Sequence, residues 1–132
     1  RAGHPNMTSR QQVTYGPYTP VVRAGDLLFV SGQVGVNPNT KTASPYLELQ
    51  TRQALQNLQA VLATAGAELS DVVKTTIYLV NMGDFQRVNA LYEEFFAAPR
   101  PARSTVGVSA LPRVAGNTRL LFEIEAVAYR EQ

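Results

Sequence analysis

Residues 54–80, ALQNLQAVLATAGAELSDVVKTTIYLV, join a helix pattern to a strand pattern. Apolar side chains recur at helical spacing over residues 54–65, polar side chains take the other face, and Gly66 is suited to end the helix. The β-branched run over residues 72–80 then predicts a strand. A helix that is apolar on one side, followed at once by an apolar strand, predicts a helix that covers a sheet.

The residues on either side extend this pattern. Ser44-Pro45 is typical of a helix start, with serine as the N-cap and proline at the first helical position. After the strand, Asp84 is a candidate N-cap for a second helix, whose apolar face is formed by Phe85, Val88, Tyr92, Phe95 and Phe96. Asn89 lies on the same face, where an amide either finds hydrogen-bond partners in the core or lines a cleft.

Strand patterns occupy much of the remaining chain. They cover residues 12–15, as a short edge strand, and residues 27–36, 104–110 and 120–129, with a turn over residues 23–26. The order strand-strand-helix-strand-helix-strand-strand predicts an α+β domain with both helices on one face of the sheet. The other face mixes threonine, glycine, glutamate and apolar side chains, so it needs a cover, and self-association is the simplest one.

Length and composition favour one globular domain. The chain has 132 residues, of which 45% are hydrophobic and 17% are charged. We expect a single domain over residues 1–132, with a flexible N-terminal tail over residues 1–11. No apolar run reaches the roughly 18 residues that span a bilayer, and no signal-peptide core is visible. We therefore expect a cytoplasmic protein without a membrane partner.

The residues that the chain lacks exclude several kinds of chemistry. It has no cysteine, which excludes disulfides, thiol catalysis and thiolate metal sites. Its one histidine, His4, cannot build a zinc site of several imidazoles, so we expect no metal in the site. The net charge is only +2, and no run of lysine or arginine occurs, so we expect no nucleic-acid partner.

Two charged residues stand in predicted strands near the C-terminal end. Arg103 lies in Pro101-Ala102-Arg103-Ser104-Thr105 and Glu123 in Phe122-Glu123-Ile124-Glu125-Ala126, and we expect neighbouring strands to hold them. A guanidinium matches a carboxylate with a planar fork of donors, and a glutamate can hold a water, or pass a proton if burial raises its pKa. Together they would bind a small acid and bring water to it. The alternative is a structural Arg–Glu ion pair.

A series of short motifs follows in one order along the chain after residue 12. They are Gly16-Pro17-Tyr18, Val30-Ser31-Gly32-Gln33, Gln53-Ala54-Leu55-Gln56-Asn57-Leu58, Asp71-Val72-Val73-Lys74-Thr75-Thr76, Asp84-Phe85 with Val88-Asn89 and Tyr92, Pro101-Ala102-Arg103-Ser104, Leu111-Pro112, and Glu123-Ile124-Glu125-Ala126-Val127-Ala128. In this order they resemble the YjgF/YER057c/UK-type family, also called the Rid (reactive intermediate deaminase) family. The resemblance covers nearly the whole chain.

This resemblance implies a chorismate-mutase-like α+β fold, with a mixed six-stranded sheet and two helices on one face, assembled as a barrel-shaped homotrimer with clefts between subunits. It also implies a cofactor-independent imine deaminase, which hydrolyses 2-iminobutanoate, 2-iminopropanoate or their enamine tautomers to 2-keto acids and ammonia. One alternative is a trimeric small-molecule-binding or chaperone-like stress protein without turnover. A further alternative is an endoribonuclease or translation inhibitor.

Residue by residue, the resemblance assigns Arg103 to the arginine that grips the substrate carboxylate and Glu123 to the glutamate that holds the attacking water. The substrate-binding positions of the cleft that it implies are Tyr18, Ser31, Gly32, Asn89 and Thr105. Thr105 stands where many members carry cysteine, and would offer its backbone carbonyl to the imine nitrogen. A few extra residues between Leu111 and Glu123 are expected to lengthen a hairpin at the rim of the cleft.

Overall fold

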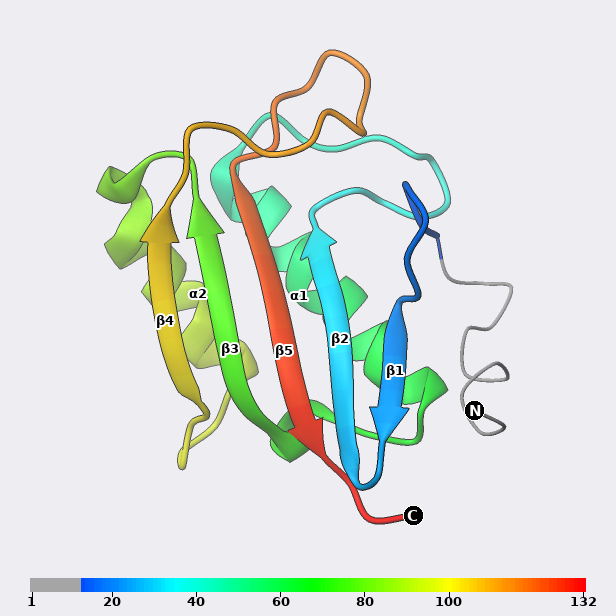
Figure 1. The fold of residues 1–132 in the computed structure, drawn as a ribbon. Coiled ribbons are helices and arrows are strands. Elements are labelled where there is room, and N and C mark those ends of the chain that lie inside the picture. The colour runs from blue at the N-terminus through cyan, green and yellow to red at the C-terminus, as the bar shows by residue number, and fades with distance from the viewer. Residues whose placement is uncertain (1–12) are drawn as a thin grey trace.

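The computed structural model describes residues 13–132, which form five β-strands and two α-helices (Figure 1). In chain order the elements are β1 (Val21–Ala24), β2 (Leu27–Val34), α1 (Leu47–Thr64), β3 (Val72–Leu79), α2 (Phe85–Phe95), β4 (Ala102–Gly107) and β5 (Phe122–Tyr129). Short 3₁₀ turns, Leu69–Asp71 and Met82–Asp84, precede β3 and α2. The tail predicted as flexible, residues 1–11, lies outside the described residues.

The strands form one mixed sheet in the order β1-β2-β5-β3-β4. β3 and β4 are parallel, whereas the other neighbouring strands are antiparallel. The α+β class is confirmed, but the described residues form five strands rather than the predicted six.

The N-terminal edge of the sheet differs from the prediction. Residues 13–15, which we expected in an edge strand, form no strand, and Val21–Ala24 takes the place beside β2 instead. The predicted turn over residues 23–26 is in fact the two-residue turn Gly25-Asp26, with Gly25 at a φ of 63°. Glycine adopts this left-handed conformation without strain, so the hairpin of β1 and β2 closes there.

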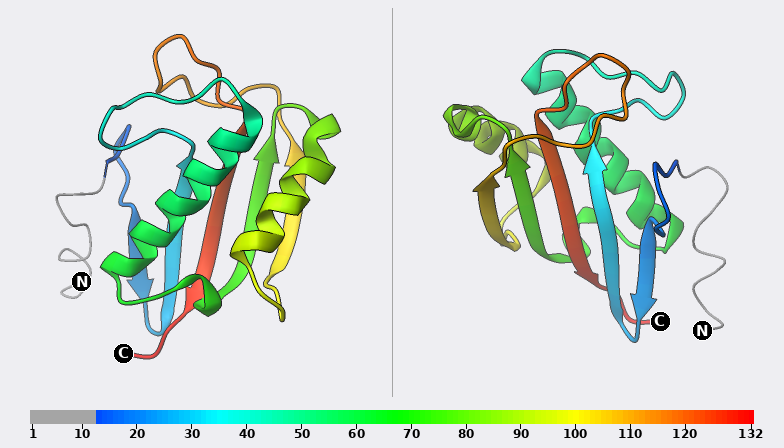
Figure 2. Two further views of the ribbon diagram at one scale, coloured as in Figure 1. Left: turned by 180° about the vertical axis from the view of Figure 1, so that it is seen from behind. Right: turned by 45° about the horizontal axis from the view of Figure 1, so that its top comes forward.

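Both helices pack on the same face of the sheet, as predicted (Figure 2). β2 and β3 flank β5 and run parallel to each other, so α1 crosses the sheet between them, and α2 makes the shorter crossover from β3 to β4. The core lies between this layer and the sheet. Its fully buried side chains include Leu55, Leu58, Leu62, Ile77, Phe122 and Ile124.

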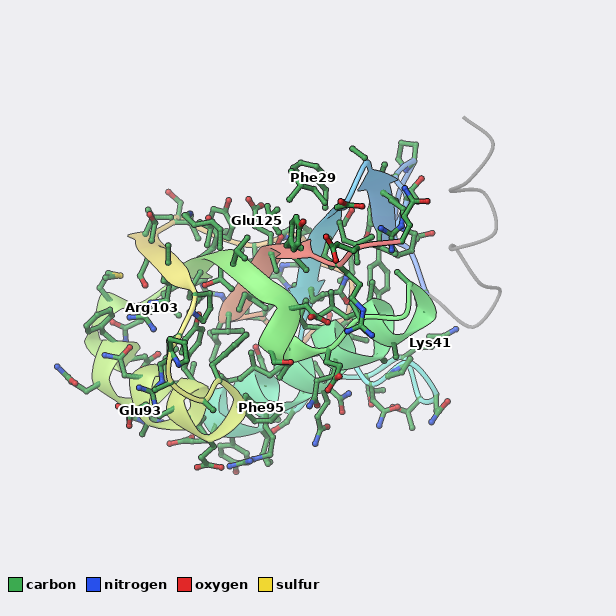
Figure 3. The ribbon with its side chains drawn as sticks, turned by 90° about the horizontal axis from the view of Figure 1, so that it is seen from below. Phe29, Lys41, Glu93, Phe95, Arg103 and Glu125 are labelled. Carbon is green, nitrogen blue, oxygen red and sulfur yellow. The ribbon has the colours of Figure 1, made fainter. Side chains whose placement is uncertain are left out.

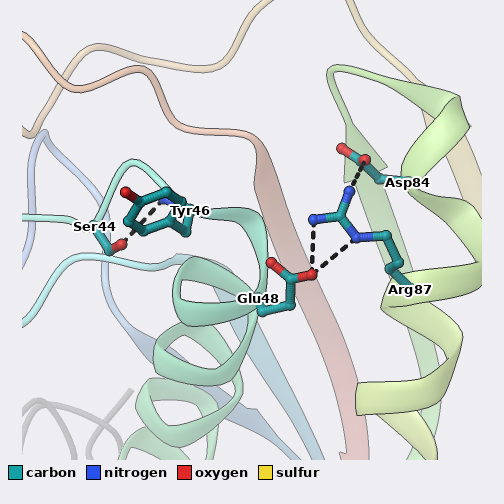
Figure 4. Close-up of polar contacts among 5 residues, drawn as sticks. All are labelled: Ser44, Tyr46, Glu48, Asp84 and Arg87. Carbon is teal, nitrogen blue, oxygen red and sulfur yellow. Dashed lines mark hydrogen bonds and ion pairs between the residues drawn. The ribbon is translucent and has the colours of Figure 1, made fainter.

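The start of α1 differs from the prediction, whereas its end agrees with it. The helix begins at Leu47, later than Pro45, and the Ser44 hydroxyl accepts a hydrogen bond of 3.1 Å from the Tyr46 backbone N–H (Figure 4). Ser44 therefore stabilises the turn before the helix and is not its N-cap. Gly66 follows the helix with a φ of 76°, as predicted for a residue that ends it.

Asp84 stands at the N-cap of α2, as predicted, but its carboxylate accepts from Arg87 and not from the helix backbone. Arg87 lies 3.1 Å from Asp84 Oδ1 and 2.7 Å from Glu48 Oε2 of α1, so it joins the two helices (Figure 4). The Arg87 and Glu48 side chains are 54% and 50% exposed. Pairs this exposed add little stability.

The chain does not pass from β4 to β5 through a hairpin. β3 lies between these two strands, so residues 108–121 form a long loop over the end of the sheet (Figure 1). The expectation of a lengthened hairpin is therefore wrong. Ala115 and Leu120 anchor the loop by packing with Val34 and Val36 in a second, smaller core.

Gln50 of α1 also fixes this loop. Its side chain is fully buried, and its Nε2 donates to the carbonyls of Ser44 and Arg119, at 2.8 Å each. Its Oε1 accepts from the backbone N–H of Leu121, also at 2.8 Å. One amide thereby satisfies backbone groups of two separate loops that would otherwise be buried without partners.

The face of the sheet without helices carries exposed apolar side chains. They are Leu27, Phe29, Val106 and Tyr129, with exposed fractions between 37% and 47%. Figure 3 shows Phe29 and Glu125 on this open face and Arg103 on the side of α2. The open face thus has the mixed character for which we predicted a cover. Within residues 13–132, no helix has the length and apolar character needed to cross a membrane.

Candidate functional site

Arg103 lies half-buried on the edge strand β4 with its side chain against α2. Its neighbour in β3 is Thr75, which is fully buried beneath the helices. The guanidinium carbon lies 4.8 Å from the ring centroid of Tyr92 and 5.5 Å from that of Phe85, within cation–π distance. None of the ion pairs within residues 13–132 involves Arg103, so its charge is available to a ligand.

A cavity of about 480 Å³ opens beside this guanidinium, and we call it the arginine cavity. It is lined by Gln86, Asn89, Ala90, Tyr92, Glu93, Arg100, Pro101 and Arg103. Asn89 Oδ1, and Thr105 Oγ1 two residues beyond Arg103, are buried without a hydrogen-bond partner among the described residues. Buried polar atoms nearly always have partners, so these two are candidates for ligand contacts. Of the alternatives for Asn89, the geometry favours an amide that lines a cleft.

Tyr92 is the support on which Arg103 rests. The Tyr92 and Thr75 hydroxyl oxygens lie 2.7 Å apart, which fixes the ring against β3. Burial raises the pKa of Tyr92, so the phenol stays neutral at physiological pH. The helical pattern alone places Phe85 and Tyr92 on the apolar face of the second helix. Their spacing of seven residues on one helix face, followed by a strand arginine, is the signal that indicates an aromatic support.

Glu123 lies half-buried on β5, on the open face of the sheet. It lines a second cavity of about 300 Å³, the glutamate cavity, together with Tyr15, Tyr18, Ser31, Gly32, Val34, Pro112 and Val114. Burial, and to a lesser extent the charge of Glu125, raises the pKa of Glu123. This carboxyl therefore keeps its proton to higher pH than an ordinary glutamate, which suits a group that exchanges protons during a reaction.

Gly32 gives the Glu123 carboxylate its room. A Cβ at Gly32 would overlap Glu123 Oε2 and lie 2.8 Å from its Cδ, a separation that real Cβ atoms do not show. The register between β2 and β5 shifts between Val30 and Gln33, so Ser31 and Gly32 form a bulge. The sequence left open whether Ser31-Gly32 is a bulge or a cavity wall, and it is both.

Ser31 and Tyr18 line the same cavity in different ways. The Ser31 hydroxyl donates to the Thr19 carbonyl at 2.6 Å, and the Ser31 N–H donates to the Pro20 carbonyl at 2.9 Å. Ser31 thus holds the segment that carries Tyr18 against β2. Tyr18 is 43% exposed, and its hydroxyl accepts from the Tyr15 N–H at 3.1 Å. This geometry gives Ser31 a positioning role and leaves Tyr18 at the cavity wall.

Tyr78 is a further neighbour of Glu123 that the sequence analysis treated only as a strand residue. The register of β3 and β5 pairs it with Glu123, and its hydroxyl donates to Glu125 Oε1 at 3.1 Å. Burial and this hydrogen bond raise the pKa of Tyr78, so it remains a donor.

Arg103 and Glu123 do not meet within one chain. β3 separates β4 from β5, so the expectation that neighbouring strands hold both residues is wrong. In β3, Arg103 has Thr75 as its register partner, and Glu123 has Tyr78. Positions 75 and 78 are an odd number of residues apart, so they point to opposite faces of the sheet. The described residues accordingly contain no ion pair between Arg103 and Glu123.

The two cavities offer complementary chemistry. The arginine cavity presents the Arg103 guanidinium and the Asn89 oxygen, neither of which has a side-chain partner among the described residues, and these groups suit a carboxylate next to an N–H group. The glutamate cavity presents a carboxyl of raised pKa, which suits a water molecule and a proton. The described part of the chain holds no cluster of three or more histidine, aspartate or glutamate side chains that suits a metal ion.

The chain is similar in sequence and in structure to several known proteins. The family described as Endoribonuclease L-PSP matches residues 8–130. The chain is 44% identical to a RutC family protein of Pyrococcus horikoshii, over 88% of this chain and 89% of the relative. It is 40% identical to the 2-iminobutanoate/2-iminopropanoate deaminase of Escherichia coli, over 93% and 94%. The crystal structure of E. coli TdcF with bound serine is similar with a TM-score of 0.85 and 33% identity, over 94% and 98%.

Proposed function

The chain belongs to the YjgF/RutC/RidA family, and from this premise we propose that it hydrolyses small 2-imino acids, such as 2-iminobutanoate and 2-iminopropanoate, to 2-keto acids and ammonia. We propose further that it does so without a cofactor, as a cytoplasmic homotrimer. One E. coli relative carries the name of this activity. The observation that carries the proposal is the Arg103 guanidinium, held on aromatic rings and without a carboxylate partner in the described residues.

Arg103 would bind the carboxylate that stands next to the imine carbon. Two parallel, charge-assisted hydrogen bonds fix such a group in one plane. Asn89 Oδ1, which is buried without a partner among the described residues, would accept from the imine N–H. The resemblance gives the same role to the backbone carbonyl of Thr105. Serine, the molecule named in the TdcF structure, likewise has a carboxylate beside a nitrogen-bearing carbon.

Glu123 would orient a water molecule and take one of its protons as the oxygen adds to the imine carbon. The raised pKa of Glu123 lets the same carboxyl return that proton to nitrogen. The carbon–nitrogen bond then breaks, the second water proton also passes to the nitrogen, ammonia leaves, and the carbon keeps the oxygen as the carbonyl of the keto acid. Gly32 and Tyr18 would line the space for this water.

Because Arg103 and Glu123 face opposite sides of the sheet, we propose that each complete cleft forms between two copies. The arginine cavity of one copy would then meet the glutamate cavity of the next. Such contacts would also cover the exposed apolar side chains Phe29 and Val106 of the open face. A closed ring of identical contacts gives every cleft the same composition.

An imine-trapping assay tests the activity. An amino-acid oxidase generates 2-iminopropanoate or 2-iminobutanoate in place, and semicarbazide reports the imine that is left. We expect wild type to accelerate imine loss, Arg103→Lys to lose most of the activity because it keeps the charge but not the fork, and Arg103→Ala to lose all of it. A wild-type rate in Arg103→Lys contradicts the role given to the guanidinium. No acceleration by wild type contradicts the deaminase.

Mixing two inactive variants tests the shared cleft. Copies with Arg103→Ala and copies with Glu123→Gln are dissociated, mixed in equal amounts and reassembled. About one quarter of the clefts then combine an intact Arg103 with an intact Glu123, because each side is of the required kind half of the time. We expect activity near that fraction, and none when either variant is reassembled alone. An inactive mixture contradicts a cleft shared between copies.

Two alternative functions, an endoribonuclease and a binding protein without turnover, can be distinguished from the deaminase by experiment. The matched family is described as an endoribonuclease. Against this, the chain has a net charge of only +2 and a single histidine, His4, so it lacks a basic stripe and a histidine pair. Strongly salt-dependent RNA binding with cleavage would favour the endoribonuclease. Binding of keto acids without turnover of imines would favour a binding protein.

A further inference from the structure

Arg100 places a second guanidinium in the arginine cavity. Arg100 and Arg103 both line this space of about 480 Å³. Both also act on the hydroxyl of Tyr92, because each guanidinium charge lowers the pKa of that phenol against the larger, opposite effect of burial. Because both side chains line one cavity, a single ligand that fills it can contact both cations.

The end of the Arg100 side chain is free to bind. Its Nε donates to the Phe96 carbonyl at 2.8 Å, which fixes the side chain, while the hydrogen bonds among residues 13–132 leave its two terminal nitrogens unused. No ion pair within those residues includes Arg100 or Arg103. Two unpaired cations in one cavity repel each other, so an anion that reaches both is favoured.

The charge of the lining decides what kind of anion fits. Glu93 is the one carboxylate among the residues that line the cavity, against the two arginines. An imino acid with a single carboxylate would pair with Arg103 and leave Arg100 without a partner. An imino acid with a second carboxylate satisfies both guanidinium groups.

We propose that Arg100 selects substrates with a second carboxylate, and that this protein prefers 2-imino dicarboxylates, 2-iminosuccinate first, over 2-iminopropanoate and 2-iminobutanoate. The inference rests on the proposed deaminase function and names its substrate class. Arg103 binds the carboxylate beside the imine, and Arg100 binds the distal one. Hydrolysis forms a bond between the water oxygen and C2 and breaks the bond between C2 and nitrogen. Both water hydrogens leave with the nitrogen as ammonia, and the product is oxaloacetate.

The test compares two substrates on the same protein. Aspartate oxidase generates 2-iminosuccinate, a second amino-acid oxidase generates 2-iminopropanoate from alanine, and semicarbazide traps both. The variant is Arg100→Gln, which keeps a hydrogen-bonding amide but removes the charge. The control is Lys41→Gln, which removes one positive charge from an exposed turn far from Arg103 (Figure 3). The quantity measured is the ratio of kcat/KM for the dicarboxylate to kcat/KM for the monocarboxylate.

We expect the ratio of the two kcat/KM values to be above one in wild type and to fall about tenfold in Arg100→Gln. A tenfold loss is at the lower end of the range for one charge-assisted hydrogen bond, as suits an exposed side chain. The wild-type ratio should also fall at high salt, and Lys41→Gln should leave it unchanged. Equal ratios in wild type and Arg100→Gln, with 2-iminopropanoate still hydrolysed, overturn the inference and leave the deaminase standing.

A second measurement keeps the two proposals separable. Calorimetric titration with oxaloacetate and with pyruvate, the two products, compares the dianion and the monoanion without turnover. Tighter binding of oxaloacetate that is lost in Arg100→Gln supports the inference even if neither imine is hydrolysed, in which case only the proposed activity fails. Equal binding of both products by wild type overturns the role of Arg100.

Discussion

Gly32→Ala is expected to remove most of the proposed activity and to leave the protein folded. The new Cβ would overlap Glu123 Oε2 and lie 2.8 Å from its Cδ and 3.2 Å from its Cγ. Only the end of one side chain stands in the way, so the carboxylate can rotate, at about 1 kcal/mol of folding free energy. A reacting group displaced by about 1 Å loses roughly one hundredfold in rate, so we expect kcat/KM to fall by about that factor.

Gly35→Ala provides the contrast, because there the obstacle is backbone. Its Cβ would overlap the carbonyl oxygen of Gln50 and lie 2.6 Å from the Gln50 Cα. A backbone cannot rotate away, so α1 must shift from the end of β2. Overpacking of this kind lowers the free energy of unfolding by about 3 kcal/mol, which corresponds to roughly 10 °C in Tm for a domain of this size.

Thermal unfolding followed by circular dichroism, run beside the imine-trapping assay, separates the two cases. Gly32→Ala should unfold within a few degrees of wild type and be nearly inactive, and Gly35→Ala should unfold well below both. Wild-type kcat/KM in Gly32→Ala would refute the reasoning, because it would mean that the position of the Glu123 carboxylate does not matter for the reaction. A large loss of Tm in Gly32→Ala would refute the claim that a side chain alone gives way.

Two further changes test the surroundings of the site. Glu125→Gln keeps an acceptor for Tyr78 but removes a charge that raises the pKa of Glu123. Glu123 then ionises at lower pH, so the acid side of the pH profile of kcat/KM should shift to lower pH. An unchanged pH profile contradicts this coupling. Gln50→Ala leaves backbone groups of two loops unpaired and should lower the free energy of unfolding in urea by about 3 kcal/mol. The exposed Gln59→Ala should change it by less than about 0.5 kcal/mol, and equal effects of the two would argue against the role of Gln50.

Elements that depend on local periodicity could be predicted from the sequence. The apolar spacing of α1, its end at Gly66 and the alternation of Phe122 and Ile124 with Glu123 in β5 all match the structure, because each is set by near neighbours in the chain. The first strand could not be predicted in this way. Val21–Ala24 is a strand because Gly25 closes a hairpin that pairs it with β2, and such pairing is not encoded in the periodicity of four residues.

The candidate site shows the same division. Local sequence singled out Arg103, Glu123 and Asn89 as candidates, each with a structural alternative. It could not indicate which of them lie together, because that depends on the strand order β2-β5-β3-β4, which joins strands far apart in the chain. Arg100 was missed for a related reason, since only the fold of the link before β4 brings it into the arginine cavity.

The separation of Arg103 from Glu123 is enforced by the core of the protein. A shift of β4 by one residue would turn Arg103 to the open face, but it would also remove the guanidinium from Tyr92 and turn Ala102 and Ser104 toward α2. A shift of β5 by one residue would expose its buried apolar row and bury its glutamates, at a much greater loss of stability. Each residue is therefore held on its own face by packing that a single chain cannot change. A cleft that needs both residues has to take them from two copies, which is why activity in the mixture of inactive variants is the decisive observation.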